Sequence, residues 1–147
     1  MTVIAWDGKT LAADKRSVCA GKATTVTKLF RADGWMLAVS GDLVKGLEMV
    51  EWFRNGRDPK ELPPFQRTKE GYVPLLAISP GREIFHFEDS HVPFRVEEKV
   101  YAMGSGRDYA LAAMWMGRDA EQAVNVATAL DTGCGNGCDV MKLEGQP

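Results

Sequence analysis

The sequence predicts an α+β fold in which two antiparallel sheets lie between packed helices. Short apolar runs separated by turn-forming residues fill positions 2–40 and recur over 73–103, which is typical of strands. One helical pattern separates these two groups, and a helical pair follows the second. Strands and helices that come in separate groups favour an α+β fold over an alternating parallel one. At 147 residues, we expect one domain spanning 1–147.

The first predicted element is a hairpin that turns at Asp7-Gly8. This dipeptide favours a two-residue turn, so Thr2–Trp6 should pair with Lys9–Asp14. Counting back from such a turn sets Trp6 opposite Lys9 and Thr2 opposite Ala13. Simple alternation then points the Thr2 and Asp14 side chains to opposite faces, so they converge only through a twist, a bulge or a third strand.

A second hairpin and a helix follow. Thr24–Phe30 and Trp35–Ser40 are predicted strands joined by a turn at 31–34, and Lys28 lies within the first of them. Apolar residues recur at helical spacing from Asp42 to Phe53, with Asp42 as the cap and Asn55-Gly56 as the stop. The proline-rich stretch 58–69 is predicted to be a peripheral loop with at most a short turn.

The second half of the chain repeats this order of strands followed by helices. Its predicted strands are Val73–Ser79, Arg82–Phe87 and Val100–Met103, then come helices Arg107–Met116 and Asp119–Leu130, divided at Gly117, and a closing strand Asp139–Leu143.

Composition excludes several classes of function. A net charge of −2, with scattered Lys and Arg, offers no footprint for nucleic acid. No apolar run is long enough to cross a membrane, and no secretion signal opens the chain. Cys19, Cys134 and Cys138 form an odd, sparse set that suits a reducing cytoplasm, and we interpret them as structural thiols. A metal site at Cys134 and Cys138 is the weaker interpretation, because His86 and His91 are distant in sequence.

Thr2 becomes chemically important if Met1 is removed, which a small second residue permits. A terminal threonine carries a hydroxyl nucleophile together with its own α-amine, whose reference pKa of about 7.7–8.0 allows the neutral amine to act as general base. Taken alone, Thr2 is more simply interpreted as a strand residue near a chain end.

The motifs around Thr2 resemble those of the proteasome β-subunit family, especially its HslV-type members, nearly end to end. Ala12-Ala13-Asp14-Lys15-Arg16 is similar to the family's Ala-Asp motif at the end of the first hairpin, which implies that Asp14 is the catalytic aspartate. Val26-Thr27-Lys28-Leu29 is similar to the segment that carries the family's lysine, which implies that role for Lys28. A buried ammonium needs a carboxylate, and a cation near the Thr2 hydroxyl favours its deprotonation.

Three further segments extend the resemblance. Val39-Ser40-Gly41-Asp42 matches the turn whose glycine N–H binds the oxyanion, implying that role for Gly41. Ala102-Met103-Gly104-Ser105-Gly106, which precedes a helix, resembles the block whose serine bonds near the nucleophile's amine, implying that role for Ser105. Asp131 opens a segment similar to the family's Asp, two spacers and Ser-Gly, and is implied to hold the amine and Ser105.

Two departures from the family pattern stand out. Cys134 replaces the serine of the last motif, and because a thiol is a poorer hydrogen-bond partner, we expect it to act through its backbone. The proline-rich stretch stands where the family usually has a longer helical region.

The resemblance implies a four-layer αββα sandwich of the N-terminal-nucleophile hydrolases and a threonine-type peptidase that needs no cofactor. It also implies polypeptide substrates, a homo-oligomeric ring and, in some relatives, an AAA+ ATPase unfoldase.

Other functions stay open from the sequence. An assembly protein of the same fold that retains Met1 is the first alternative, and an amide hydrolase for small molecules is another. A cysteine hydrolase that uses Cys134 with His86 or His91 is the weakest, because nothing places a histidine beside Cys134.

Overall fold

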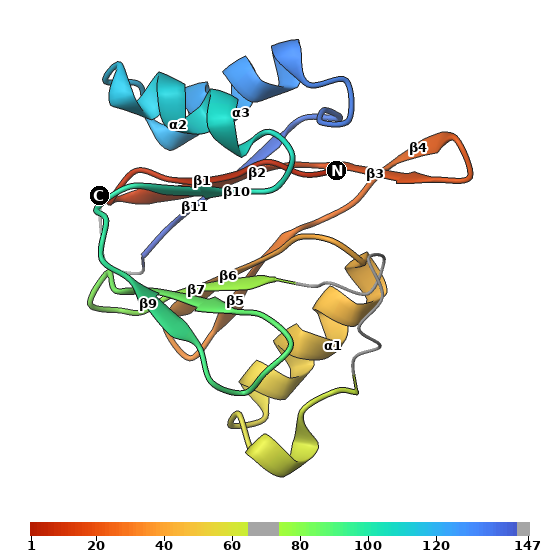
Figure 1. The fold of residues 1–147 in the computed structure, drawn as a ribbon, viewed down its shortest axis with the longest axis vertical. Helices are drawn as coiled ribbons and strands as arrows, with labels where there is room; N and C mark the ends of the chain where they lie inside the picture. Colours follow the sequence, from red (N-terminus) through yellow and green to blue (C-terminus); the bar gives the residue numbers. More distant parts are fainter. Residues whose placement is uncertain (65–73, 144–147) are drawn as a thin grey trace.

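The chain forms four layers, with helices outside and two sheets inside (Figure 1). The computed structural model describes residues 1–64 and 74–143. Helices α2 (Arg107–Trp115) and α3 (Ala120–Leu130) cover the first sheet, and helix α1 (Leu43–Arg54) covers the second. The predicted α+β class and αββα layering are confirmed.

The first sheet carries the chain terminus on a central strand. Its strands run in the order β10-β1-β2-β11, and all neighbours are antiparallel. Their bounds are β1 Ile4–Trp6, β2 Thr10–Asp14, β10 Tyr101–Met103 and β11 Cys138–Lys142. Residues next to Thr2 are thereby held from both sides by paired strands.

The second sheet is a five-stranded antiparallel meander in the order β5-β6-β7-β8-β9. Its strands are β5 Leu29–Ala32, β6 Trp35–Val39, β7 Leu75–Ile78, β8 Ile84–Phe87 and β9 Phe94–Val96. A separate hairpin, β3 (Arg16–Cys19) with β4 (Lys22–Thr25), projects beyond the layers (Figure 1).

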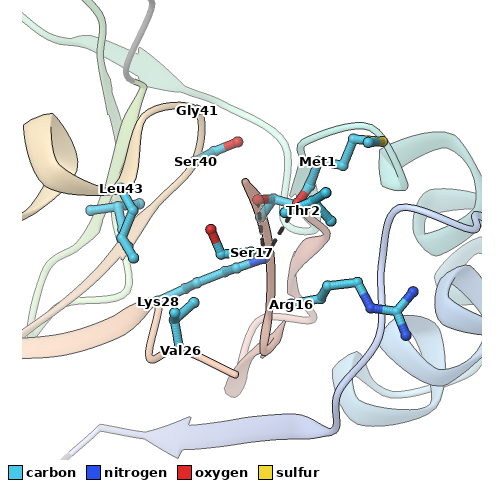
Figure 2. Close-up of a pocket in the computed structure, with 11 residues that line it drawn as sticks. Met1, Thr2, Arg16, Ser17, Val26, Lys28, Ser40, Gly41 and Leu43 are labelled. Atoms are coloured by element: carbon cyan, nitrogen blue, oxygen red, sulfur yellow. Dashed lines mark hydrogen bonds between the residues drawn. The ribbon is translucent and has the colours of Figure 1, made fainter. Parts of the chain in front are cut away.

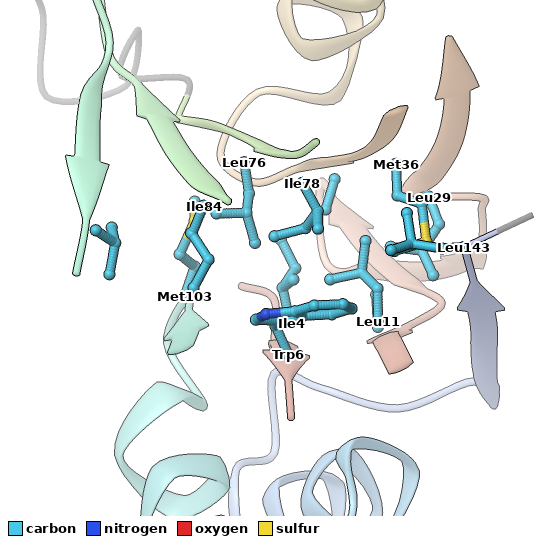
Figure 3. Packing of buried hydrophobic residues seen from close by; sticks show 13 residues of the cluster. Ile4, Trp6, Leu11, Leu29, Met36, Leu76, Ile78, Ile84, Met103 and Leu143 are labelled. Atoms are coloured by element: carbon cyan, nitrogen blue, oxygen red, sulfur yellow. The ribbon is translucent and has the colours of Figure 1, made fainter. Parts of the chain in front are cut away.

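Apolar side chains fill each of the three spaces between layers. Figure 3 shows the space between the sheets, where Ile4 and Trp6 of the first sheet meet Leu76 and Ile78 of the second. Alanines, including Ala123, dominate the contact between the first sheet and α2–α3, so the helices lie close to the strands. Bulkier residues of α1 pack on the second sheet. The strands are therefore fixed on both faces.

The register of the first hairpin differs from the prediction by two residues. Trp6 pairs with Leu11, not with Lys9, and Ile4 pairs with Ala13, so Thr2 does not lie opposite Ala13. The turn is longer because the Asp7 carboxylate accepts hydrogen bonds from the N–H groups of Lys9 and Thr10. An Asx-type turn thus replaces the two-residue turn.

The strand predicted over Thr24–Phe30 is two strands. β4 ends at Thr25 and β5 begins at Leu29, so Lys28 precedes a strand instead of lying inside one. The projecting hairpin and β9 were not predicted from the sequence. Two predictions, the loop over 58–69 and the strand beginning at Val73, extend into 65–73, outside the described residues. A short 3-10 helix, Pro59–Glu61, lies in the part of that loop that is described.

The helices agree with the prediction to within one residue at most ends. Asp42 caps α1 by accepting a hydrogen bond from the N–H of Lys45, at 3.1 Å. Asp119 caps α3 in a capping box with Gln122. The short polar residues at these positions satisfy N–H groups that have no partner within the helix.

Gly46 sets how closely α1 approaches the second sheet. A Cβ at this position would lie 2.8 Å from the Cβ of Val39, so Gly46→Ala must push the helix away. The better helix propensity of alanine offsets part of this cost, and we expect a net loss of about 1–2 kcal/mol in the free energy of unfolding, measured in urea. Leu47→Ala, on the exposed face of α1, should cost less than about 1 kcal/mol. A stabilised Gly46→Ala protein would show that the packing described here is wrong.

Candidate active site

Thr2 lies just before β1 and is nearly buried, with 4% of its surface exposed. Its carbonyl accepts hydrogen bonds from the N–H of Gly106, at 3.1 Å, and from the Ser105 hydroxyl, at 3.4 Å. Its N–H donates to Ser105 Oγ at 3.3 Å. With Met1 present this nitrogen is an amide, and it marks the place of the α-amine in a chain that begins at Thr2. The backbone of Thr2 is thus fixed on both sides of its Cα.

The Thr2 hydroxyl faces a buried ion pair. Lys28 Nζ donates to Asp14 Oδ1 at 2.7 Å and to Thr2 Oγ1 at 3.2 Å (Figure 2). Asp14 is fully buried and Lys28 is 4% exposed, so solvent does not screen this pair. The ammonium lies within hydrogen-bond reach of the threonine oxygen with Asp14 as its counter-ion, and a cation in this position favours loss of the hydroxyl proton.

Asp14 is held by backbone donors as well as by Lys28. Oδ1 also accepts from the N–H of Val3, and Oδ2 accepts from the N–H groups of Gly135 and Arg16. These bonds compensate the carboxylate for its lost water and fix its orientation. Because Lys28 comes from the strand connection entering the second sheet, it bridges Thr2 and Asp14 without requiring them to share a face of the hairpin.

Gly41 lies across the pocket from Thr2, in the turn between β6 and α1. Its φ of +77° is a conformation that glycine adopts without strain. Within residues 1–64 and 74–143, its N–H donates to no acceptor. Gly41 and Thr2 line the same pocket.

Ser105, Asp131 and Cys134 form a polar cluster behind the Thr2 nitrogen. The hydrogen bond from Ser105 lowers the pKa of Asp131, so this carboxylate stays charged at neutral pH. The Cys134 thiol lies 3.5 Å from Asp131 Oδ2 and 3.7 Å from Ser105 Oγ. The thiol itself belongs to the cluster, contrary to the expectation that Cys134 acts through its backbone alone.

Two glycines allow this cluster to approach Thr2. At Gly104, where φ is +91°, a Cβ would collide with the Thr2 carbonyl. At Gly106, a Cβ would lie 2.9 Å from the Cβ of Val3. The Gly-Ser-Gly segment is therefore needed for close packing against Thr2 and Val3, which precede β1.

Sequence reasoning missed the role of Arg16. Its guanidinium donates to Asn136 Oδ1 at 2.9 Å and to the Thr132 carbonyl at 2.8 Å. It thereby ties the segment after Asp14 to the loop that carries Asp131 and Gly135. The sequence feature that could have indicated this contact is the close spacing of glycines in that loop. A Cβ on Gly135 would collide with the Arg16 guanidinium.

Polar groups make up most of the lining of the pocket beside Thr2 (Figure 2). Val26 and Leu43 add apolar side chains, and Ser17 and Ser40 contribute hydroxyls. Over the described ranges, no group of three or more His, Cys, Asp or Glu side chains is placed to hold a metal ion. In the same ranges, no helix has the length and apolar character to span a membrane.

Comparison with solved structures identifies the fold. BPH of Thiobacillus denitrificans superposes with a TM-score of 0.72 at 22% identity, covering 99% of each chain, and a structure of BPH in complex with epoxomicin also matches. HslV from Trypanosoma brucei has a TM-score of 0.70 at 19% identity, covering 95% of this chain and 97% of that one. Anbu, an ancestral β-subunit from Yersinia bercovieri, has a TM-score of 0.71 at 15% identity, covering 96% and 80%.

The chain has the HslV-type fold. The resemblance of its motifs to proteasome-type β-subunits is thus matched by the arrangement of its strands and helices. No protein-family model and no curated protein matches the sequence. At these identities the comparisons establish the HslV-type fold, and the argument for chemistry depends on the side chains.

Removing Lys28 should destabilise the protein, because Asp14 would be left buried with its charge unmatched. We expect Lys28→Met to lower the free energy of unfolding by about 3 kcal/mol in urea. Lys45 provides the matched control, since its ion pair with Glu48 lies on the surface of α1 at 3.2 Å. Lys45→Met should cost less than about 1 kcal/mol. Equal losses in the two variants would contradict the buried pair.

The three cysteines should differ in reactivity toward iodoacetamide. Burial raises the pKa of both Cys134 and Cys138 to about 11, which leaves little thiolate at pH 8, whereas Cys19 is exposed on the projecting hairpin. Peptide mapping at pH 8 should therefore find native protein alkylated at Cys19 first and at all three positions after denaturation. Rapid alkylation of Cys134 in the native protein would instead favour the cysteine-hydrolase alternative. That alternative needs a histidine beside the thiol, whereas His86 bonds Tyr101 at 3.0 Å and stacks on Phe94.

Proposed function

We propose that this protein is a threonine-type endopeptidase whose nucleophile is Thr2 after removal of Met1. The contact that carries the proposal is that of Lys28 Nζ, which lies 2.7 Å from a buried carboxylate and 3.2 Å from the Thr2 hydroxyl. An ion pair that served only the protein surface would be exposed to water and would not contact a hydroxyl, so the burial of Lys28 and its contact with Thr2 favour a catalytic role. Asp14, Lys28, Gly41, Ser105 and Asp131 are proposed to support the reaction.

The first step is attack of Thr2 Oγ on a peptide carbonyl. The hydroxyl proton passes to the neutral α-amine of Thr2, which acts as general base. Lys28 stabilises the oxygen as it loses this proton, and Asp14 holds the ammonium in place. The tetrahedral oxyanion accepts a hydrogen bond from the N–H of Gly41, which has no acceptor in the described chain.

The second step releases the two products. The protonated amine gives its proton to the leaving nitrogen, the C–N bond breaks, and an ester on Thr2 remains. Water, deprotonated by the same amine, then hydrolyses the ester and restores the hydroxyl. Ser105 and Asp131 are proposed to hold the amine in position, because Ser105 Oγ lies 3.3 Å from the Thr2 nitrogen and is itself bonded to Asp131.

The pocket beside Thr2 is lined mainly by polar groups, and we propose that it receives the backbone of an extended polypeptide next to the scissile bond. We further propose a homo-oligomeric ring that encloses the sites, in cytoplasmic protein turnover and with an AAA+ ATPase unfoldase as a possible partner. The HslV-type fold supports this part of the proposal.

The alternative is an assembly protein that keeps Met1, and one observation favours it. The Met1 carbonyl accepts a hydrogen bond from Lys28 Nζ at 3.4 Å, and its side chain packs where a Cβ on Gly133 would collide. An unprocessed chain is thus accommodated in the site, with no free amine on Thr2.

Intact mass with an epoxyketone probe separates these functions, because the probe needs both the hydroxyl and the free amine. We expect the native protein to lack Met1 and to gain one probe per chain on Thr2. Thr2→Ser should retain labelling, since it keeps both groups, and Thr2→Ala should abolish it. Retained Met1 without labelling would establish the assembly-protein alternative.

Substrate class is tested with the same two variants. Unfolded casein and short fluorogenic peptides should be cleaved by the native protein and by Thr2→Ser, and not by Thr2→Ala. Hydrolysis confined to small amides that are not peptides would instead favour the small-molecule amidase.

A further inference from the structure

A second pocket adjoins the pocket beside Thr2. Ser40 and Gly41 line both pockets, so the two spaces meet at the turn that precedes α1. The second pocket has a volume of about 350 Å³, which is enough for one amino-acid side chain. Its lining also includes residues of β8, of β10 and of the segment that leads into α2, among them His86, Tyr101, Gly104 and Arg107.

The second pocket lies on the leaving side of the scissile bond. In the proposed reaction the Thr2 amine gives its proton to the leaving nitrogen, so this nitrogen must approach the nitrogen of Thr2. Ser105 Oγ lies 3.3 Å from the Thr2 nitrogen. Gly104, the residue before Ser105, lines the second pocket and not the pocket beside Thr2. The residue that follows the scissile bond therefore extends toward the second pocket.

Arg107 brings a positive charge to the wall of this pocket. Its side chain is 57% exposed, and Nη1 donates to the Gly104 carbonyl at 3.1 Å, which holds the guanidinium beside the segment that carries Ser105. Its Nε lies 4.0 Å from Asp108 Oδ1, too far for a hydrogen bond. A guanidinium has five N–H donors, so several stay available to a ligand while one bonds Gly104.

The charge of Arg107 is not explained by the stability of α2. Arg107 is the first residue of that helix, and the helix dipole disfavours a positive charge at a helix N-terminus. Asp108, the next residue, has the sign that the dipole favours. A cation at this position therefore suits a ligand in the second pocket better than it suits the helix.

The other groups around the second pocket leave its lining positive. Burial lowers the pKa of His86, so this ring is neutral at pH 7. Burial, Glu98 and Glu88 raise the pKa of Tyr101, whereas Arg107 lowers it, so charges of both signs act near the pocket. The two glutamates do not belong to its lining. Among the described residues that line the second pocket, Arg107 is thus the one charged at neutral pH, and it favours an anion.

We propose that the second pocket receives the side chain of the residue after the scissile bond, and that Arg107 selects Asp or Glu at this position. The charged hydrogen bond between a guanidinium and a carboxylate is stronger than a bond to a neutral group. This inference rests on the proposed threonine chemistry and names a residue that determines its specificity.

The preference is measured first on the wild-type protein. Mass spectrometry of the products from unfolded casein should find Asp and Glu enriched directly after the cleaved bonds, relative to their share in casein. A peptide that spans one such site is then made in three forms, with Glu, Gln or Lys after the scissile bond. We expect kcat/KM to fall about fivefold from the Glu form to the Gln form and further to the Lys form, as one partly exposed ion pair allows.

Charge variants of Arg107 test its role. Arg107→Glu should reverse the order, so that the Lys form is cleaved faster than the Glu form, and Arg107→Lys should keep the wild-type order. Arg107→Ala should remove most of the difference. Arg118→Glu is the matched control, because Arg118 is an exposed arginine just beyond the other end of α2 and lines a different pocket, so the order should not change. A purely structural role of Arg107 would change all three rates alike.

Equal rates for the three peptides in the wild type, or an unchanged order in Arg107→Glu, would overturn the inference. Labelling of the same samples by the epoxyketone probe separates this inference from the proposed function. Labelled Thr2 and cleaved casein without any preference would refute the role of the second pocket alone. Neither labelling nor cleavage would refute the threonine chemistry, and the inference with it.

Discussion

The buried contact between Lys28 and Asp14 constrains the rest of the structure. A charged pair with almost no access to water is tolerated only when geometry and hydrogen bonding are both good, and Asp14 meets this with three backbone donors besides the ammonium. Asp14 ends β2 of the first sheet, and Lys28 lies directly before β5 of the second sheet. The distance between the sheets therefore decides whether the ammonium reaches both the carboxylate and Thr2, and that distance is set by the apolar side chains shown in Figure 3. Packing and chemistry are coupled through one lysine.

Local patterns in the sequence predicted most elements but not their exact pairing. Asp42 and Asp119 correctly indicated where α1 and α3 begin, because a capping carboxylate accepts hydrogen bonds from N–H groups only a few residues away. The first hairpin was predicted with the wrong register, since the Asp7 side chain competes for the turn and lengthens it. The projecting hairpin escaped detection because its residues are largely exposed and carry no alternating apolar pattern.

In the candidate site, too, the local sequence predicted some features and not others. The resemblance to a family is what placed Asp14 and Lys28 together beside Thr2, because no local rule brings together residues this far apart in the fold. The contacts of Arg16 with Thr132 and Asn136 span more than a hundred residues of sequence. Their only local trace is a run of closely spaced glycines, and the reason for it appears once the guanidinium is seen lying against Gly135.

The position of the chain terminus has a practical consequence. Thr2 is buried just before the central strand β1, and Met1, which is 66% exposed, leads from it past Gly133. A purification tag joined ahead of Met1 would keep an amide on Thr2 and would extend from the pocket itself. Because the proposed chemistry needs a free amine on Thr2, recombinant protein prepared in that way would not react with the epoxyketone probe even when folded. An affinity tag belongs at the other end of this chain.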